Sequence, residues 1–191
     1  MSQPIYIPER LVVYVVASDE GLAPNIQGNH CSLAVCKPVV RRVAKLKTDW
    51  IVGMSTNKHG KKKLIYVMQV EEKLSFNQFF LDNRFDSKKP HKTNPKGDNF
   101  IWDGQALRCA SHYGHAEKMT RNLSVDNVLV ARQYWYFGEN APEIPHGLFE
   151  TKLVQGPRRG HKIVANAFAI DAFYNWLINQ YQPGIHGTYR D

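Results

Sequence analysis

Two side chains that can act in catalysis precede a predicted helix start. His30 and Cys31 lie a few residues before Pro38, which suits the first turn of a helix because its missing N–H would be unpaired there. The free N–H groups of a helix start can bind an anion and can lower the pKa of a thiol. Cys31 is therefore a candidate nucleophile, and His30 is a second candidate catalytic residue. The apolar residues around Cys31 and Cys36 favour another interpretation, in which both are small buried side chains.

Two further candidate catalytic residues lie in polar segments. His161 follows Gly160 in the basic string 158–162, where the glycine allows close approach of the backbone to a phosphate and the histidine could act as an acid or base near neutral pH. A solvated basic turn is the alternative explanation of this string. Asp98 is the other candidate, and it ends a polar segment over residues 84–98 that lacks helical or strand periodicity.

No metal site and no cofactor is predicted. Cys109, His112 and His115 could supply zinc ligands, but their spacing departs from the paired motifs of structural zinc sites. The chain also lacks a GxGxxG fingerprint, a P-loop and a carboxylate pair of recognisable spacing, so nothing in it indicates a nucleotide-cofactor transferase.

The aromatic segment 133–138 is a candidate ligand surface. In a strand, Tyr134 and Tyr136 share one face while Trp135 and Phe137 share the other, so one pair either faces away from the core or lines a pocket. Aromatic planes stack on bases, and a few polar groups then read the edge of the base. The alternative is that a helix and a loop cover both faces. The polar residues considered beside this segment are Arg132, Asp98 and Asn99.

Periodicity predicts the strands that position these residues. Continuous apolar runs rich in β-branched residues are typical of buried strands, and two of the runs flank a Lys-rich turn in the manner of a hairpin. Three of the predicted strands should belong to one strongly curved sheet, namely Leu11–Ala17, Trp50–Met54 and Leu64–Val70. The remaining candidates are Phe100–Trp102, one strand from Val128 to Phe137, and a weaker one at Lys152–Val154.

Three helices are predicted. A short basic helix should begin at Pro38, and a second should run to Leu81 from Ser75, with Gln78 completing a capping box. Aromatic and aliphatic residues recur at helical spacing over 167–181, which predicts a C-terminal helix packed on the sheet. The segment 84–98 between them is predicted to be a surface loop.

The order of strand, polar loop, short basic helix and hairpin resembles the opening half of PUA-like barrels, notably EVE and ASCH domains. That resemblance implies a curved α+β barrel that binds nucleotides or modified bases.

A closer resemblance spans residues 10 to 163. The sequence is similar to the nucleotide modification associated domain 2 family, whose members are associated with phage and bacterial systems that modify DNA bases. The resemblance implies a place in such a system and no particular reaction. One departure is Thr48–Asp49, where the family pattern has Gly-Asp. The segments that carry the resemblance are APN (23–25), CSLAVCKPVVRRVAK, DWIVG, LIYVMQVEEKLSFNQFF, RFDSKKP, GDN (97–99), VLVARQYWYFG (128–138) and RGHK (159–162).

Composition indicates one intracellular domain. The 191 residues are 43% hydrophobic, enough for a single sizeable core over residues 1–191. No window of about 20 apolar residues and no signal peptide is present, and three irregularly spaced cysteines suit a reducing compartment. We therefore expect a soluble cytoplasmic protein of a bacterial cell or phage-infected host.

A formal net charge of +8 indicates an anionic partner, with nucleic acid favoured and DNA preferred over RNA by the resemblance. Basic proteins of this size are common, and a Lys run can simply solubilise a hairpin tip. The candidate phosphate contacts are Arg41, Arg42, Lys61, Lys62, Lys63, Arg158, Arg159 and Lys162.

The sequence thus favours an α+β, PUA-like barrel that binds a nucleotide or a modified base in DNA. An enzyme that installs, alters or removes a base modification is the alternative, and a phage protein that binds a host defence component is a third. Oligomeric state is left open. The candidate ligand residues are Asn25, Asn29, His30, Ser55, Asp98, Asn99, Tyr134, Trp135, Tyr136 and Phe137.

Overall fold

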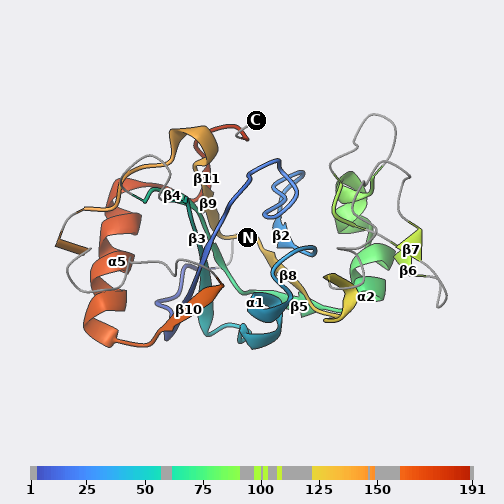
Figure 1. Ribbon diagram of the computed structural model, residues 1–191, viewed down its shortest axis with the longest axis horizontal. Coiled ribbons are helices and arrows are strands. Elements are labelled where there is room, and N and C mark those ends of the chain that lie inside the picture. The colour runs from blue at the N-terminus through green and yellow to red at the C-terminus, as the bar shows by residue number, and fades with distance from the viewer. Residues whose placement is uncertain are drawn as a thin grey trace.

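The computed structural model (Figure 1) describes residues 4–56, 62–90, 97–99, 101–102, 107–108, 122–145, 147–148 and 160–189. The helices of this part of the chain are α1 (Pro38–Val43), α2 (Phe76–Leu81) and α5 (Ala167–Gln180), with the 3-10 helices η1 (Asn83–Lys88) and η2 (Gly138–Asn140). Its strands are β1 (Arg10–Val15), β2 (Cys31–Leu33), β3 (Asp49–Met54), β4 (Leu64–Gln69), β5 (Glu72–Leu74), β6 (Ile101–Trp102), β7 (Leu107–Arg108), β8 (Val128–Ala131), β9 (Tyr134–Tyr136), β10 (His161–Val164) and β11 (Gly184–Ile185).

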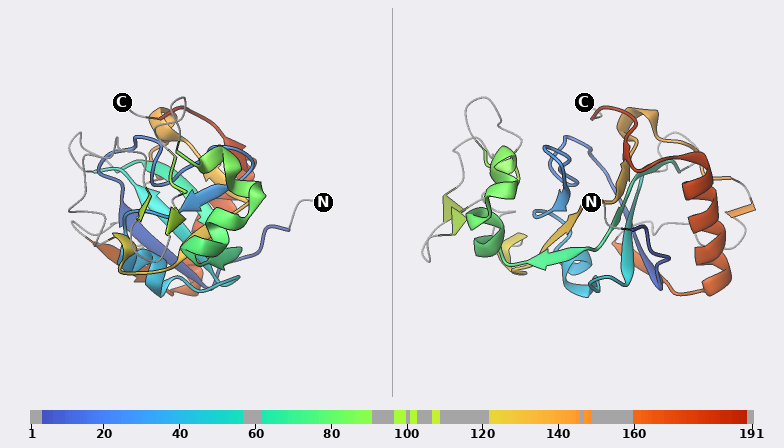
Figure 2. Two further views of the ribbon diagram at one scale, coloured as in Figure 1. Left: turned by 90° about the vertical axis from the view of Figure 1, so that its right-hand side faces the viewer. Right: turned by 180° about the vertical axis from the view of Figure 1, so that it is seen from behind.

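The elements stack in four layers along the long axis of the molecule (Figures 1 and 2). Helix α5 covers one face of a large sheet, a small sheet packs against the other face, and α2 and η1 cover the outer face of the small sheet. The two faces of the small sheet belong to different cores: Cys31 and Ala131 pack toward the large sheet, whereas Val130 packs toward Phe79 and Phe85. The described residues form a mixed α+β arrangement with its main core between the two sheets.

The three core strands predicted from the sequence are confirmed, and they lie side by side in the large sheet. Among the described residues this sheet has the order β10-β1-β3-β4-β9-β11. β1 runs parallel to β3, and β3 and β4 form the predicted antiparallel hairpin. Because both faces of the sheet are covered, every residue of β3 and β4 is buried, which explains why these strands read as continuous apolar runs.

The predicted helices are also confirmed. Pro38 occupies the first turn of α1, and Ser75 and Gln78 form the expected capping box at the start of α2. Helix α5 begins after Asn166, whose side chain accepts a hydrogen bond from the N–H of Ala169. In the described part of the chain, no helix combines the length and apolarity needed to cross a membrane.

The single strand predicted from Val128 to Phe137 is two strands. β8 belongs to the small sheet, of order β2-β8-β5 over the described residues, and β9 belongs to the large sheet. The chain bends between them at Arg132 and Gln133. The described strands therefore meet at a corner between two sheets and do not close into the predicted barrel. Strand propensity does not locate such a bend, because both halves are equally suited to a strand. The polar pair Arg132–Gln133 between the two apolar runs is the feature of the sequence that marks it.

The segment 84–98 is not the predicted surface loop. Its first part forms η1, and both Phe85 and Lys88 are buried. Asp98 and Asn99 are fully buried where the segment returns to the fold. Polar composition predicts exposure, but Lys88 and Asp98 instead form hydrogen bonds inside the protein with Asn25 and Ser32. Residues 91–96, and the strand candidate Lys152–Val154, lie outside the described residues.

Glu71 holds the corner between the two sheets. It lies where the chain passes from β4 to β5, opposite the bend between β8 and β9, and its side chain is buried. Its two carboxylate oxygens accept hydrogen bonds from the backbone N–H groups of Arg132 (3.0 Å) and Gln133 (2.7 Å). The bend removes these two amides from the regular ladder, and the carboxylate satisfies both of them.

Replacement of Glu71 should therefore destabilise the corner. Glu71→Ala leaves two backbone amides without their acceptor and should lower the free energy of unfolding by about 2–4 kcal/mol, measured by urea denaturation. Glu71→Gln retains one acceptor and should lose less. The control is Glu72→Ala, which removes a half-exposed ion pair with Arg84 and should cost less than about 1 kcal/mol. If Glu71→Ala and Glu72→Ala lowered the free energy of unfolding by equally small amounts, this role of Glu71 would be contradicted.

Candidate functional site

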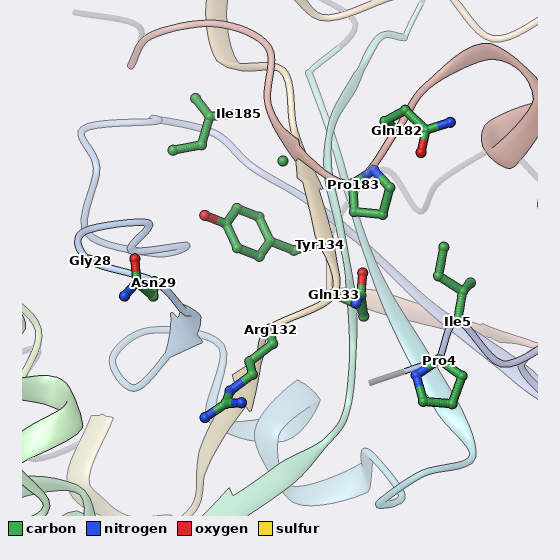
Figure 3. Close-up of a pocket in the computed structure, with 11 residues that line it drawn as sticks. Pro4, Ile5, Gly28, Asn29, Arg132, Gln133, Tyr134, Gln182, Pro183 and Ile185 are labelled. Carbon is green, nitrogen blue, oxygen red and sulfur yellow. The ribbon is translucent and has the colours of Figure 1, made fainter. Parts of the chain in front are cut away.

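A cleft of about 820 Å³ opens at this corner (Figure 3). Four segments of the described chain line it: Pro4–Ile5, the loop at Gly28–Asn29, the bend from Arg132 to Tyr134, and the segment Gln182–Ile185 that follows α5. Sequence analysis proposed Asn29 and Tyr134 as ligand residues, and the cleft brings these two together across more than 100 positions of the chain. The lining combines an aromatic ring, apolar Pro and Ile side chains, amides and one guanidinium.

Tyr134 forms the aromatic part of the lining. Its ring extends from β9 toward the Gly28–Asn29 loop and lies below Ile185 (Figure 3). The residue is 7% exposed, and burial raises the pKa of its hydroxyl to about 12. Ile185 beside it is 55% exposed, although it is a large apolar side chain. Together they present an apolar surface that a flat ring could contact.

The Gly28–Asn29 loop is held by its own backbone and by η1. Asn25 and Ser32 pair through two backbone hydrogen bonds of 2.8 and 2.9 Å, which close the loop at its base. Gly28 at the tip has a φ of 72°, and a side chain at this position would collide with Ser87 of η1. Asn29 is consequently exposed at the tip, with its side chain on the cleft.

A buried polar cluster supports this loop from behind. Lys88 donates from Nζ to the backbone and side-chain oxygens of Asn25 at 2.9 and 3.0 Å. Ser32 donates to Asp98 Oδ2 at 2.7 Å, and Asn99 bonds to carbonyl groups near α2 and η1. Burial raises the pKa of Asp98 to about 6, although the charge of Lys88 and the Ser32 hydrogen bond act in the opposite direction. These groups fix the loop and do not line the cleft.

Arg132 carries the charge of the cleft. Its Nε donates to Nε2 of His30 at 3.1 Å, and the His30 ring packs edge-on against Phe85 at 5.2 Å between ring centroids. His30 is buried, and its pKa is lowered first by that burial and then by Arg132 and other nearby cations. His30, another predicted ligand residue, is therefore connected to the cleft through Arg132 and is not one of its lining residues.

The other aromatic side chains of the segment 133–138 do not reach the cleft. Trp135 is fully buried and donates from Nε1 to the carbonyl of Tyr181. Phe137 is 1% exposed and stacks on the ring of His186. Tyr136 is fully buried, with its hydroxyl donating to Asp19. Helix α5 and the 17–30 loop thus cover the two faces, and Tyr134 is the aromatic residue of the segment that lines the cleft.

Tyr136 belongs to a row of tyrosines that crosses the large sheet. Register places His161, Tyr14, Gly53, Tyr66 and Tyr136 opposite one another on successive strands. The hydroxyls of Tyr14 and Tyr66 are 2.7 Å apart, and the glycine between them leaves room for the Tyr66 ring. His161 therefore lies four strand spacings from Tyr136 of β9, roughly 19 Å along the sheet at about 4.8 Å a strand, and it is not among the described residues that line the cleft. The structure does not bring this candidate catalytic residue to the cleft.

Cys31 has the surroundings of a structural cysteine. It is fully buried, its Sγ lies 3.8 Å from the sulfur of Met68, and burial raises the pKa of its thiol to about 12. A nucleophilic cysteine needs a thiolate and access to substrate. Ser55, a predicted ligand residue, accepts a hydrogen bond from the N–H of Lys63 in the β3–β4 hairpin and is not among the described lining residues.

Arg41 has a structural position. It is fully buried, and its guanidinium donates to the carbonyl groups of Cys36 (3.0 Å), Val125 (2.7 Å), Asn127 (2.6 Å) and Asn122. Burial lowers its pKa to about 10. The donors expected to contact phosphate are instead occupied in joining α1 to the chain that leads into β8.

The remaining phosphate candidates are dispersed. Arg42 is exposed on α1, Lys62 is buried, and Lys63 and Lys162 are half-buried in the β3–β4 connection and in β10. None of these four is among the described residues that line the cleft. Three further candidates lie outside the described residues: Lys61, Arg158 and Arg159.

The described residues contain no group of three or more histidine, cysteine or acidic side chains arranged to hold a metal ion. The candidate zinc ligands Cys109, His112 and His115 lie outside the described part of the chain.

Sequence reasoning missed several lining residues. Arg132 was considered only as a neighbour of the aromatic segment, although the pair Arg132–Gln133 interrupts two apolar runs and so marked the bend. Gln182 and Ile185 follow the helix-ending Pro183. No periodicity indicated that Gly184–Ile185 would form a strand parallel to β9 and bring them to the cleft.

The structure thus defines an α+β protein with a cleft at the corner of two sheets. The chain belongs to the nucleotide modification associated domain 2 family, whose sequence profile matches residues 8–190. The resemblance expected from residues 10–163 is confirmed and extends through α5 and β11. No curated protein and no solved structure matches the chain significantly.

The burial of Cys31 predicts low thiol reactivity. In the native protein Cys31 should react with iodoacetamide roughly tenfold or more slowly than the half-buried Cys36, because the thiolate is the reacting form. Peptide mass spectrometry after timed labelling measures both rates, and the two should become equal in concentrated urea. Native labelling of Cys31 as fast as that of Cys36 would contradict the structural role.

The buried carboxyl of Asp98 predicts a pH effect on stability. Its folded pKa of about 6 exceeds the ordinary value of 3.8, so its stabilising effect is greatest below pH 3.8 and is lost as the pH rises toward 6. Relative to Asp98→Asn, which retains an acceptor for Ser32, the wild-type free energy of unfolding should fall by roughly 2 kcal/mol between pH 4 and pH 7.

Urea denaturation across this pH range measures the difference. Asp86→Asn is the control, because it removes an exposed carboxylate from η1 and should change stability by less than about 1 kcal/mol at each pH. A constant difference between wild type and Asp98→Asn from pH 4 to pH 7 would show that the Asp98 carboxyl is not perturbed.

Proposed function

We propose that the corner cleft binds a nucleotide or a modified base in DNA. The observation that carries the proposal is the placement of Tyr134 beside Asn29 and Arg132 in a protein of the nucleotide modification associated domain 2 family. A cleft of about 820 Å³ lies within the range of ligand pockets, which is roughly 300–1,000 Å³. The formal charge of +8 supports an anionic ligand.

The lining supplies the two kinds of contact that a base needs. Tyr134 and Ile185 offer an apolar surface for its flat face, and aromatic contacts of this kind supply affinity with little dependence on sequence. The Asn29 amide offers both donors and an acceptor, which suits the edge of a base because that edge also carries hydrogen-bond donors and acceptors. The exposed loop tip places that amide in reach of a ligand, while Asn25 and Lys88 hold the loop from behind.

Binding to DNA would draw on exposed cations outside the cleft. Arg42, Lys45 and Lys47 are exposed on α1 and on the turn that follows it. Contacts from such residues to phosphates release counterions and make the affinity dependent on salt.

The structure offers less support for the enzyme alternative. Cys31 is buried with a raised pKa, Asp98 lies behind the small sheet, and His161 lies several strands away from the cleft. His30 is adjacent to the cleft but is engaged with Arg132. The cleft therefore presents groups that recognise a ligand and brings no nucleophile to it from the described residues.

Tyr134→Ala tests the proposal. With deoxynucleoside 5′-monophosphates of unmodified and 5-substituted bases as probes, calorimetric titration should show binding to the wild type. The variant should lose about tenfold or more in affinity, the effect of one base–aromatic contact worth about 1–3 kcal/mol. Tyr134→Phe should retain most of the affinity.

Asn29→Ala provides a test that does not disturb the core, because Asn29 is exposed at the loop tip, and it should also weaken binding. Phe168→Ala is the control, since this residue is 74% exposed on α5 and lies outside the described lining. The proposal is wrong if no probe binds the wild type, or if the Tyr134 and Asn29 variants bind as tightly as it does.

A further inference from the structure

We propose that Arg132, held by His30, binds the phosphate of the nucleotide, so that the cleft takes a nucleoside monophosphate unit. This inference rests on the proposed function and specifies the chemical class of its ligand. The shared chemistry is one base with one phosphate ester, whether the unit is a free nucleotide or a position within a DNA strand.

Arg132 has donors available for an anion. It is exposed, and it is the charged residue among the described residues that line the cleft. Its Nε is engaged by His30, whereas its two terminal nitrogens make no hydrogen bond to another described residue. A guanidinium presents these N–H groups as a planar fork that matches two oxygens of a phosphate.

Arg132 is held at two points, its backbone N–H and its side-chain Nε. The backbone N–H of Arg132 donates to the buried carboxylate of Glu71, which sets where the side chain begins. At the other end, His30 accepts from Nε and is itself buried against Phe85. A long side chain that is already ordered loses less conformational entropy when it binds a ligand. His30 is thus a positioning residue that acts through Arg132.

His30 can fill this role only in its neutral form. An Nε2 that accepts a hydrogen bond carries no proton, so the proton of the ring is on Nδ1. The charged groups that act on the ring are Arg132 from the bend, Arg84, Lys88 and Asp82 from η1 and its N-cap, and Glu72 from β5. The cations and burial lower the His30 pKa, which keeps the acceptor available at neutral pH. Protonation would replace the acceptor with a donor and place two cations in contact.

A single guanidinium specifies one phosphate. The remaining described lining residues are apolar or carry amides, so a second or third phosphate finds no further cation there. Arg132 lies beside Tyr134 at the bend, and Figure 3 shows both side chains on the side of the Gly28–Asn29 loop. A base against Tyr134 and a phosphate against Arg132 are therefore adjacent, as they are in one nucleotide.

The test compares a deoxynucleoside with its 5′-monophosphate and 5′-triphosphate by calorimetric titration. The wild type should bind the monophosphate about tenfold or more tightly than the nucleoside, as expected of one charge-assisted contact. The triphosphate should bind within about threefold of the monophosphate, because the described lining offers no second cation for the added charge.

Variants assign the phosphate contact. Arg132→Gln should abolish the advantage of the monophosphate, which is its tighter binding relative to the nucleoside, while the nucleoside affinity stays within about threefold. Arg132→Lys should retain part of this advantage, because a lysine is charged but lacks the planar fork of the guanidinium. Arg42→Gln is the control, since it removes an exposed charge of the same kind from α1 and should leave the advantage unchanged.

His30 variants separate positioning from a structural role. His30→Gln keeps a side-chain acceptor and should retain most of the monophosphate advantage, whereas His30→Ala should lose much of it. Acidification to pH 5 protonates part of the phosphate in every variant, and it should reduce the preference for the monophosphate clearly more in the wild type than in His30→Gln. A His30 that only supports the fold would give no such difference in pH profile.

The outcomes distinguish this inference from the proposed function. If nucleoside and monophosphate bind equally and both depend on Tyr134, the phosphate assignment is wrong while the base-binding cleft stands. If neither binds, the proposed function itself fails. A trinucleotide with phosphodiesters on both sides of the central base shows whether the bound unit is a free nucleotide or a position within a DNA strand. Tighter binding than the monophosphate points to DNA and weaker binding to a free nucleotide, and in either case Arg132→Gln must lower the affinity.

Discussion

The two hydrogen bonds that the Glu71 carboxylate accepts at the corner are the constraint on which the rest of the structure depends. β4 continues into β5 and β8 continues into β9, so the same pair of chain segments contributes to both sheets. The bend takes two amides out of the ladder, and a buried backbone N–H without an acceptor is costly. Satisfying both from one carboxylate allows the chain to leave one sheet and enter the other at this corner, where the residues of the bend line the cleft.

The site is built from polar groups that serve different purposes. Glu71, Lys88 and Asp98 are buried and hold the backbone, whereas Asn29 and Arg132 are exposed and face the cleft. The division explains why polar residues of the family-like segments, such as GDN at 97–99, are buried and are not among the described residues that line the cleft. They support the loop that carries Asn29 from behind, and the proposed contact of its amide with a ligand needs a backbone held in one conformation.

Sequence reasoning recovered what local patterns determine. The β-branched runs predicted β1, β3 and β4, and the capping box at Ser75 predicted α2. Both signals lie within a few consecutive residues, so they can be recognised without knowing the fold. It placed Asn29 and Tyr134 at a common site, which the cleft brings together. It failed at the bend beside Tyr134 and in the burial of Lys88, because both depend on partners more than 60 residues away along the chain.

A crystal structure of the protein with a deoxynucleoside 5′-monophosphate tests the central claim most directly, because it locates the base and the phosphate in one measurement. The account predicts density for the base against Tyr134 and Ile185, with the phosphate within hydrogen-bond distance of the Arg132 guanidinium. Density in the separate hollow lined by Val16, Glu20 and Lys37, or a cleft that stays empty at saturating nucleotide, would contradict it.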